Sequence, residues 1–236
     1  MRVFALQTAR AGSKSVVDKN VMPVAGLPLF LHNVTSAIAS KEIEGIYVST
    51  DSEYILDYGI ENHMEYKTIA RPPALCTDDA SHLQAIRHGL EQIEQREGCV
   101  VDILVILLGN SNGATSHDLD IAIEQLISNE GADSVQSVSA FNMFNPYRCF
   151  IEGDDNFLTT LLTDEQTRST ARKHPNDKDA FGDMLFFNGS FWVCRRSAIM
   201  NDGGKEPFPW LGNNILSHRQ EPCMELDAEW QRKWFQ

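Results

Sequence analysis

The stretch Val101–Leu108 has the sequence VDILVILL and carries the strongest strand signal in the chain. From Ile103 onward its apolar residues are continuous instead of alternating with polar ones. This pattern is typical of a parallel strand that is buried on both faces by helices. The stretch therefore predicts an α/β domain with a mostly parallel sheet at its centre.

The sequence on both sides of this strand alternates between strand and helix patterns. Strands are expected at 2–8, 46–50, 134–140 and 186–194, and helices behind Pro28, over about 81–97 and around 119–127. Such alternation predicts βαβ units and a three-layer, Rossmann-like α/β fold. In sheets of this kind, ligands bind at the carboxyl ends of the strands.

The length of 236 residues predicts one large domain, 1–236. The regular pattern loosens over 141–185, which is polar and rich in charges from Asp164 to Asp183. We interpret this segment as an insertion or oligomerisation arm within the domain, although a mobile lid would have a similar composition.

Composition excludes several classes of function. A formal net charge of −13 argues against nucleic acid as a partner, because binding to a phosphate backbone requires clustered Lys and Arg. No apolar run approaches the roughly 20 residues of a membrane span, so no membrane partner is expected. The 5 cysteines are dispersed, which argues against a disulfide framework or a zinc site and fits a cytoplasmic protein.

A local concentration of positive charge follows the first expected strand. Ala9-Arg10-Ala11-Gly12-Ser13-Lys14 is followed by Lys19-Asn20, and this loop has neither Walker nor dinucleotide-binding spacing. Gly12 permits close approach of the backbone to a ligand, amide N–H groups can surround phosphate oxygens, and the cations neutralise charge. The loop predicts a phosphate site, and a solvated loop with incidental lysines is the alternative.

An acidic pair lies near the end of the chain. Glu225 and Asp227 are two residues apart, so on a strand they would point to the same face. Adjacent carboxylates repel each other unless a cation joins them, and hard oxygen ligands suit Mg²⁺. The alternative is an exposed edge strand, which the two residues alone favour.

These motifs together resemble the acylneuraminate cytidylyltransferase family. Residues 9–20, which contain the cationic loop (Arg10–Asn20), are similar to the family signature ARxxSKxxxxKN. Later segments follow in the family's order: VSTDS at 48–52, RPPALCTDDAS at 71–81, NGSFW at 188–192 and ELDAE at 225–229. The resemblance spans nearly the whole chain, and it implies a nucleotidyltransferase domain with an inserted dimerisation arm at 141–185.

The resemblance also implies a role for each matching residue. In the family's reaction, the anomeric hydroxyl of a sialic-acid-like sugar attacks CTP, which gives the CMP-sugar and pyrophosphate. The implied catalytic residues are Arg10, Lys14, Lys19 and Asp227, and Glu225 and Asp227 would bind Mg²⁺. The implied nucleotide-binding residues are Ala9, Arg10, Gly12, Ser13, Lys14, Asn20, Arg71 and Ser81, and the sugar-binding residues are Asn188, Trp192 and Lys178. A homodimer is implied as well.

The chain departs from the family mainly on the acceptor side. Where the family has LQPTSPLR, residues 108–115 read LGNSNGAT, without the glutamine, the prolines or the arginine. Glu225 replaces an aspartate, and Trp192 replaces a tyrosine. Two alternatives therefore stay open: a related nucleotidyltransferase for a Kdo-like acid or a sugar phosphate, and a degenerate homologue that binds nucleotide without turnover.

Overall fold

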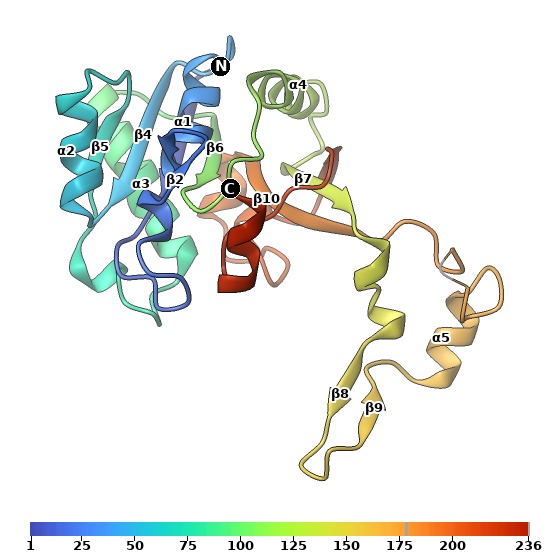
Figure 1. The fold of residues 1–236 in the computed structure, drawn as a ribbon. Coiled ribbons are helices and arrows are strands. Elements are labelled where there is room, and N and C mark those ends of the chain that lie inside the picture. The colour runs from blue at the N-terminus through green and yellow to red at the C-terminus, as the bar shows by residue number, and fades with distance from the viewer. Residues whose placement is uncertain (178, 236) are drawn as a thin grey trace. The chain divides into compact units, whose positions relative to one another are not determined.

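The computed structural model describes residues 1–177 and 179–235. Their main feature is a seven-stranded sheet with the strand order β11-β7-β10-β6-β1-β4-β5 (Figure 1). Its strands are β1 (Val3–Thr8), β4 (Gly45–Thr50), β5 (Lys67–Ala70), β6 (Ile103–Leu108), β7 (Ser134–Ala140), β10 (Leu185–Arg195) and β11 (Ile215–Arg219). A short hairpin, β2 (Pro23–Val24) and β3 (Leu27–Pro28), lies outside this sheet.

Strand pairing confirms the predicted fold class. β1 pairs in parallel with both β4 and β6, and β4 pairs in parallel with β5. β10 runs antiparallel to β6. All six residues of β6 are buried, which is why this strand is apolar throughout.

Helices cover both faces of the sheet, as the three-layer prediction requires. Side chains of α1 (Leu29–Ile38), α2 (Glu53–Glu61) and α4 (Ser116–Ile127) share one core with alternate residues of the strands, such as Ala5 and Val105. α3 (His82–Glu97) packs on the opposite face, where Gly89 lies against Leu6 of β1. α6 (Arg196–Met200) packs against α3.

The predicted helices match the structure closely, but several elements were missed, among them α2, β5 and the edge strand β11. α3 begins one residue after the expected start, and α1 begins directly after Pro28. α2 and β5 were not assigned because their amphipathic signals are short. No helix in the described part of the chain is both long and apolar enough to cross a membrane.

The strand expected at Glu225 and Asp227 is wrong. This segment is irregular and leads into a 3₁₀ helix, η6 (Glu229–Trp234). It is held by a hydrogen bond from the Leu226 N–H to the Asn110 carbonyl (2.8 Å). The partner of this segment is therefore a loop and not a strand. For this reason the segment does not have the alternating side-chain directions of a β-strand.

The chain divides into two compact units, one formed by Met1–Ser137 and Asn188–Gln236 and the other by Val138–Phe187. The second unit contains the antiparallel hairpin β8 (Phe150–Glu152) and β9 (Leu158–Thr160) and the helix α5 (Asp164–Thr170). Thr163 begins α5 with a capping box, and the rings of Tyr147 and Phe181 stack at 4.3 Å. This unit includes the whole polar segment 141–185.

Candidate functional site

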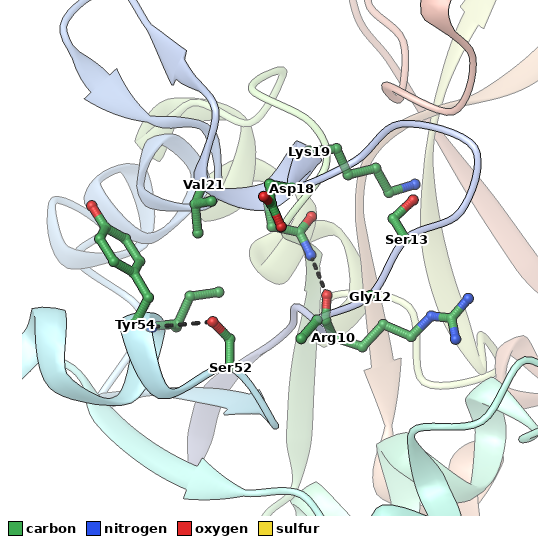
Figure 2. Close-up of a pocket in the computed structure, with 11 residues that line it drawn as sticks. Arg10, Gly12, Ser13, Asp18, Lys19, Val21, Ser52 and Tyr54 are labelled. Atoms are coloured by element: carbon green, nitrogen blue, oxygen red, sulfur yellow. Dashed lines mark hydrogen bonds between the residues drawn. The ribbon is translucent and has the colours of Figure 1, made fainter.

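A pocket of about 230 Å³ lies beyond the carboxyl ends of β1 and β4. The loop after β1 forms one wall, and the start of α2 contributes Ser52, Tyr54 and Ile55 (Figure 2). The loop residues in the lining are Arg10, Ala11, Gly12, Ser13, Asp18, Lys19, Asn20 and Val21. The pocket therefore occupies the edge of the sheet where a ligand was expected.

The loop after β1 is tied to the sheet by hydrogen bonds. The Ala11 N–H donates to Asp51 Oδ1 (2.7 Å), and the Asn20 amide donates to the Arg10 carbonyl (2.8 Å; Figure 2). Gly12 has a φ of 70°, a left-handed conformation that favours glycine. Asn20 is buried, so its structural contribution is to close the loop, which the sequence analysis did not foresee.

The three cations of the loop are each paired with a carboxylate. Lys19 Nζ lies 2.6 Å from Asp227 Oδ1. Arg10 Nη2 and Lys14 Nζ lie 2.9 Å and 2.5 Å from the two oxygens of Asp78. The ammonium of Lys14 and the guanidinium of Arg10 hold the pKa of Asp78 below its usual range. Arg10 and Lys14 thus meet at one carboxylate, and Arg10 and Lys19 line the same pocket.

Asn110, in the loop after β6, joins the two carboxylates of the acidic pair. The Asn110 amide donates to Asp227 Oδ1 (3.0 Å) and to Glu225 Oε2 (3.5 Å). Burial, followed by the charge of Asp227, raises the pKa of Glu225 to about 7. The two carboxylates are therefore close enough to repel each other, which was the reason for expecting a cation between them.

Gly189 of β10 provides the surface on which Glu225 lies. Its φ is 79°, and a Cβ added there would collide with the Glu225 side chain. The Ser111 hydroxyl donates a hydrogen bond to the Gly189 carbonyl and connects this point to the loop after β6. Glycine is required at position 189 for two reasons, the backbone conformation and the close approach of the acidic side chain.

The donor set at the acidic pair fits Mg²⁺. The described residues contain no group of three or more His, Cys, Asp and Glu side chains that could hold a metal ion. Glu225 and Asp227 would supply two hard oxygen ligands. Phosphates and water would supply the remaining ligands of the ion. Mg²⁺ commonly binds through one or two carboxylates together with substrate phosphates.

Arg71 and Ser81 lie near this region but outside the lining of the pocket. Arg71 is 7% exposed, and its guanidinium donates to Ser49 Oγ (3.1 Å) and to the Ser49 carbonyl (2.8 Å). Burial lowers the pKa of Arg71. Ser81 is exposed and directly precedes α3. Ala9 is buried, and its N–H donates to the Ser49 carbonyl (3.1 Å).

Two of the three predicted sugar-binding residues, Asn188 and Trp192, are buried residues of β10. Asn188 is 2% exposed and accepts a hydrogen bond from Ser137 Oγ (2.8 Å). Trp192 is also 2% exposed and packs edge-on against Trp210 at 5.2 Å. Neither side chain presents a surface to a sugar, so their direct contact with the acceptor gains no support. Lys178 lies outside the described residues.

Two site residues were not identified from the sequence. Asp78 was quoted only within a matching segment, and Asn110 only within the divergent loop. A signal for Asn110 was present, because it follows β6, and the carboxyl end of β6 adjoins that of β1. Asp78 offers no comparable signal, because its contacts with the loop depend on tertiary structure.

Comparison with known proteins shows the family to which the chain belongs. Residues 5–175 match the family model described as cytidylyltransferase. The chain is 31% identical over 200 residues to post-translational flagellin modification protein B of Campylobacter coli. This match covers 83% of this chain and 81% of that protein. It is 30% identical over 213 residues to N-acylneuraminate cytidylyltransferase A of Danio rerio, covering 87% of this chain. The chain spans 45% of the length of the Danio rerio protein.

Solved structures support the same assignment of the fold. CMP:2-keto-3-deoxy-manno-octonic acid synthetase complexed with CTP superposes with a TM-score of 0.68 at 15% identity. The match covers 99% of this chain and 96% of the other. At this identity the likeness concerns the fold alone, whereas the family model matches well over half of the sequence. The chain belongs to the cytidylyltransferase family.

Proposed function

We propose that this protein transfers CMP from CTP to the anomeric hydroxyl of a sialic-acid-like nonulosonic acid and releases pyrophosphate. The ion pair between Lys19 and Asp227 is the observation that carries the proposal. It joins the cationic loop to the acidic pair across 208 residues of sequence. Cations suited to phosphates thus lie beside carboxylates suited to a divalent ion. The N-acylneuraminate cytidylyltransferase among the relatives supports the choice of acceptor class.

The cationic loop would bind the phosphates of CTP. Arg10 and Lys19 line the pocket together with Gly12 and Ser13, and the side chain of Lys14 is exposed. Negative charge on the departing pyrophosphate would be stabilised by groups that are already in position. Catalysis by this part of the site is therefore orientation combined with charge neutralisation.

Glu225 and Asp227 would hold the Mg²⁺. When bound, the ion would neutralise phosphate charge and favour attack at the α-phosphorus. Asn110 donates a hydrogen bond to each of the two carboxylates, and Lys19 pairs with Asp227. Asp227 is the more exposed carboxylate of the pair, so an attacking hydroxyl could reach it and pass its proton to it.

On the acceptor side, Asn188 and Trp192 would act by positioning other groups. Asn188 and Gly189 are neighbours in β10, and Glu225 lies directly on Gly189. In this proposal the packing of Trp192 keeps β10 in place, and the sugar contacts the loop at Gly109–Thr115 instead. That loop is the part of the site in which this chain differs most from the family.

The experiment is an assay of pyrophosphate release with four nucleotides and a panel of acceptors. We expect release with CTP, and not with UTP, GTP or ATP, in the presence of a nonulosonic acid and Mg²⁺. Release with only a Kdo-like acid or a sugar phosphate would replace the proposed acceptor. No release with any combination, despite measurable CTP binding, would favour the degenerate homologue.

We further propose that the unit Val138–Phe187 mediates a homodimer. Its hairpin exposes four large apolar side chains: Phe150, Ile151, Phe157 and Leu158 are 54% to 73% exposed. A second copy of this chain would cover such a hairpin from water. Light scattering should give a dimer for the wild type and a monomer for a variant with Phe157→Ser and Leu158→Ser. A monomeric wild type at working concentration would reject the proposal.

A further inference from the structure

Asp78 occupies the cationic loop in the manner of an anionic ligand. One of its carboxylate oxygens pairs with Arg10 and the other with Lys14. Arg10 also donates from Nη1 to the carbonyl of Cys76 (3.2 Å), so the segment around Asp78 is attached to the loop at two points. A phosphate group could bridge the same two cations through two of its oxygens.

The three cations of the loop differ in how firmly they are held. The Lys19 side chain is 15% exposed and pairs with Asp227, a residue of the acidic pair. The side chains of Lys14 and Arg10 are 83% and 36% exposed, and their shared partner Asp78 is 43% exposed. Exposed ion pairs exchange readily, because water and other ions compensate for the lost partner.

We propose that Asp78 is an internal competitor for the phosphate site, which selects for ligands that carry more than one phosphate group. It leaves Arg10 and Lys14 when the phosphates of the nucleotide bind, and it returns as pyrophosphate departs. The identity of the nucleotide rests on the proposed function above. The competition itself requires only that an anion binds the loop.

In this arrangement a single phosphate would be a poor competitor. One phosphate would exchange with one carboxylate at the same two cations, with little change in the number of ion pairs. Pyrophosphate carries two phosphate groups, so in this proposal it would pair with Arg10 and Lys14 and also with Lys19, which lines the same pocket as Arg10. Asp78 thus reduces binding of monophosphates and helps to release pyrophosphate after transfer.

The test is a titration of wild type, Asp78→Asn and Asp79→Asn with inorganic pyrophosphate by calorimetry. The Asp78→Asn change removes the negative charge and keeps the shape of the side chain, and Asp79 is an exposed neighbour of the same charge. We expect Asp78→Asn to bind pyrophosphate about threefold to tenfold more tightly than wild type, the scale of a lost exposed pair or two. Asp79→Asn should change the affinity by less than about twofold.

Equal affinity of wild type and Asp78→Asn for pyrophosphate would overturn the inference. So would an equal gain in Asp79→Asn, since net charge would then explain the effect. Asp78→Ser provides a second variant, and thermal unfolding shows whether each variant is folded. Tighter pyrophosphate binding without turnover of CTP by wild type would keep the inference and reject the proposed function. Turnover of CTP with unchanged pyrophosphate affinity in Asp78→Asn would do the reverse.

Discussion

The cationic loop (Arg10–Asn20) and the acidic segment (Cys223–Asp227) meet at the ion pair between Lys19 and Asp227 and in an apolar cluster that contains Val16 and Leu226, but their charged side chains are held in different ways. Lys14 projects into solvent with its side chain 83% exposed. Glu225 packs directly on Gly189 of the central sheet. Charge on the loop can therefore be exchanged between partners, whereas the acidic segment depends on the shape of the surface beneath it.

The largest expected effect is at the ion pair that joins the two regions. Lys19→Ala should lower kcat/KM by about a hundredfold to a thousandfold, because a positioned donor to the phosphates is lost. The fold should be kept, since Lys19 lies in a single 3₁₀ turn, η1 (Lys19–Val21), outside the sheet. Steady-state kinetics and thermal unfolding measure the two properties. Lys41→Ala, at an exposed lysine, is the control, and full activity of Lys19→Ala would remove this residue from the phosphate site.

Gly189→Ala tests whether the acidic segment depends on close packing. The new Cβ would collide with Glu225 in a backbone conformation that alanine rarely adopts. We expect the free energy of unfolding to fall by about 1–3 kcal/mol. We also expect the variant to need a higher Mg²⁺ concentration for half-maximal activity, because Glu225 would be displaced. Gly131→Ala is a matched control, because its Cβ would meet open space. Similar behaviour of the two variants would show that Gly189 does not position Glu225.

Asn110→Ala tests the residue that joins the two carboxylates. Loss of its amide should weaken metal binding by about tenfold to a hundredfold, as is common for groups that orient metal ligands. Activity at saturating Mg²⁺ should be largely retained. Binding of Mn²⁺ to the protein, followed by electron paramagnetic resonance, measures the affinity without turnover. The control is Asn112→Ala, an exposed residue of the same loop, and an unchanged affinity in Asn110→Ala would contradict the assignment.

The smallest effect concerns the support beneath the cationic loop. His82 lies close to Thr8, with Nε2 and Oγ1 3.0 Å apart, and burial followed by the charge of Arg71 lowers its pKa to about 4. The unfolded chain takes up this proton near pH 6.5, so folded-state stability falls as the pH drops from 6.5 towards 4. Between pH 7 and pH 5 the loss should be about 1–2 kcal/mol.

Denaturant unfolding at the two pH values measures this loss. His82→Gln should lose less stability than wild type over the same interval, because it has no group that titrates there. His117→Gln, at an exposed histidine of α4, should behave as wild type. Equal acid sensitivity of His82→Gln and wild type would show that another group is responsible.

Local patterns were sufficient to predict much of the fold. The apolar run of β6 and the helical spacing of α3 identified the parallel sheet and one of its covering layers, since both patterns reflect burial on known faces. The short elements α2 and β5 were missed because nine and four residues carry little periodic signal. The acidic segment was assigned to a strand because two alternating carboxylates have the same spacing in an irregular extended segment.

The sequence alone determined which residues were candidates for charge chemistry, since a cationic loop in an acidic chain and a close pair of carboxylates can be read from composition and spacing. Only the tertiary structure decided which of them meet. It placed Asp227 on Lys19, Asn110 between the carboxylates and Asp78 across Arg10 and Lys14. It also placed Asn188 and Trp192 in the interior. The reason is that the contacts between charged groups join loops that are distant in sequence. The distances between these groups depend on the register of the strands and on the packing beneath the loops. Neither can be read from a local sequence pattern.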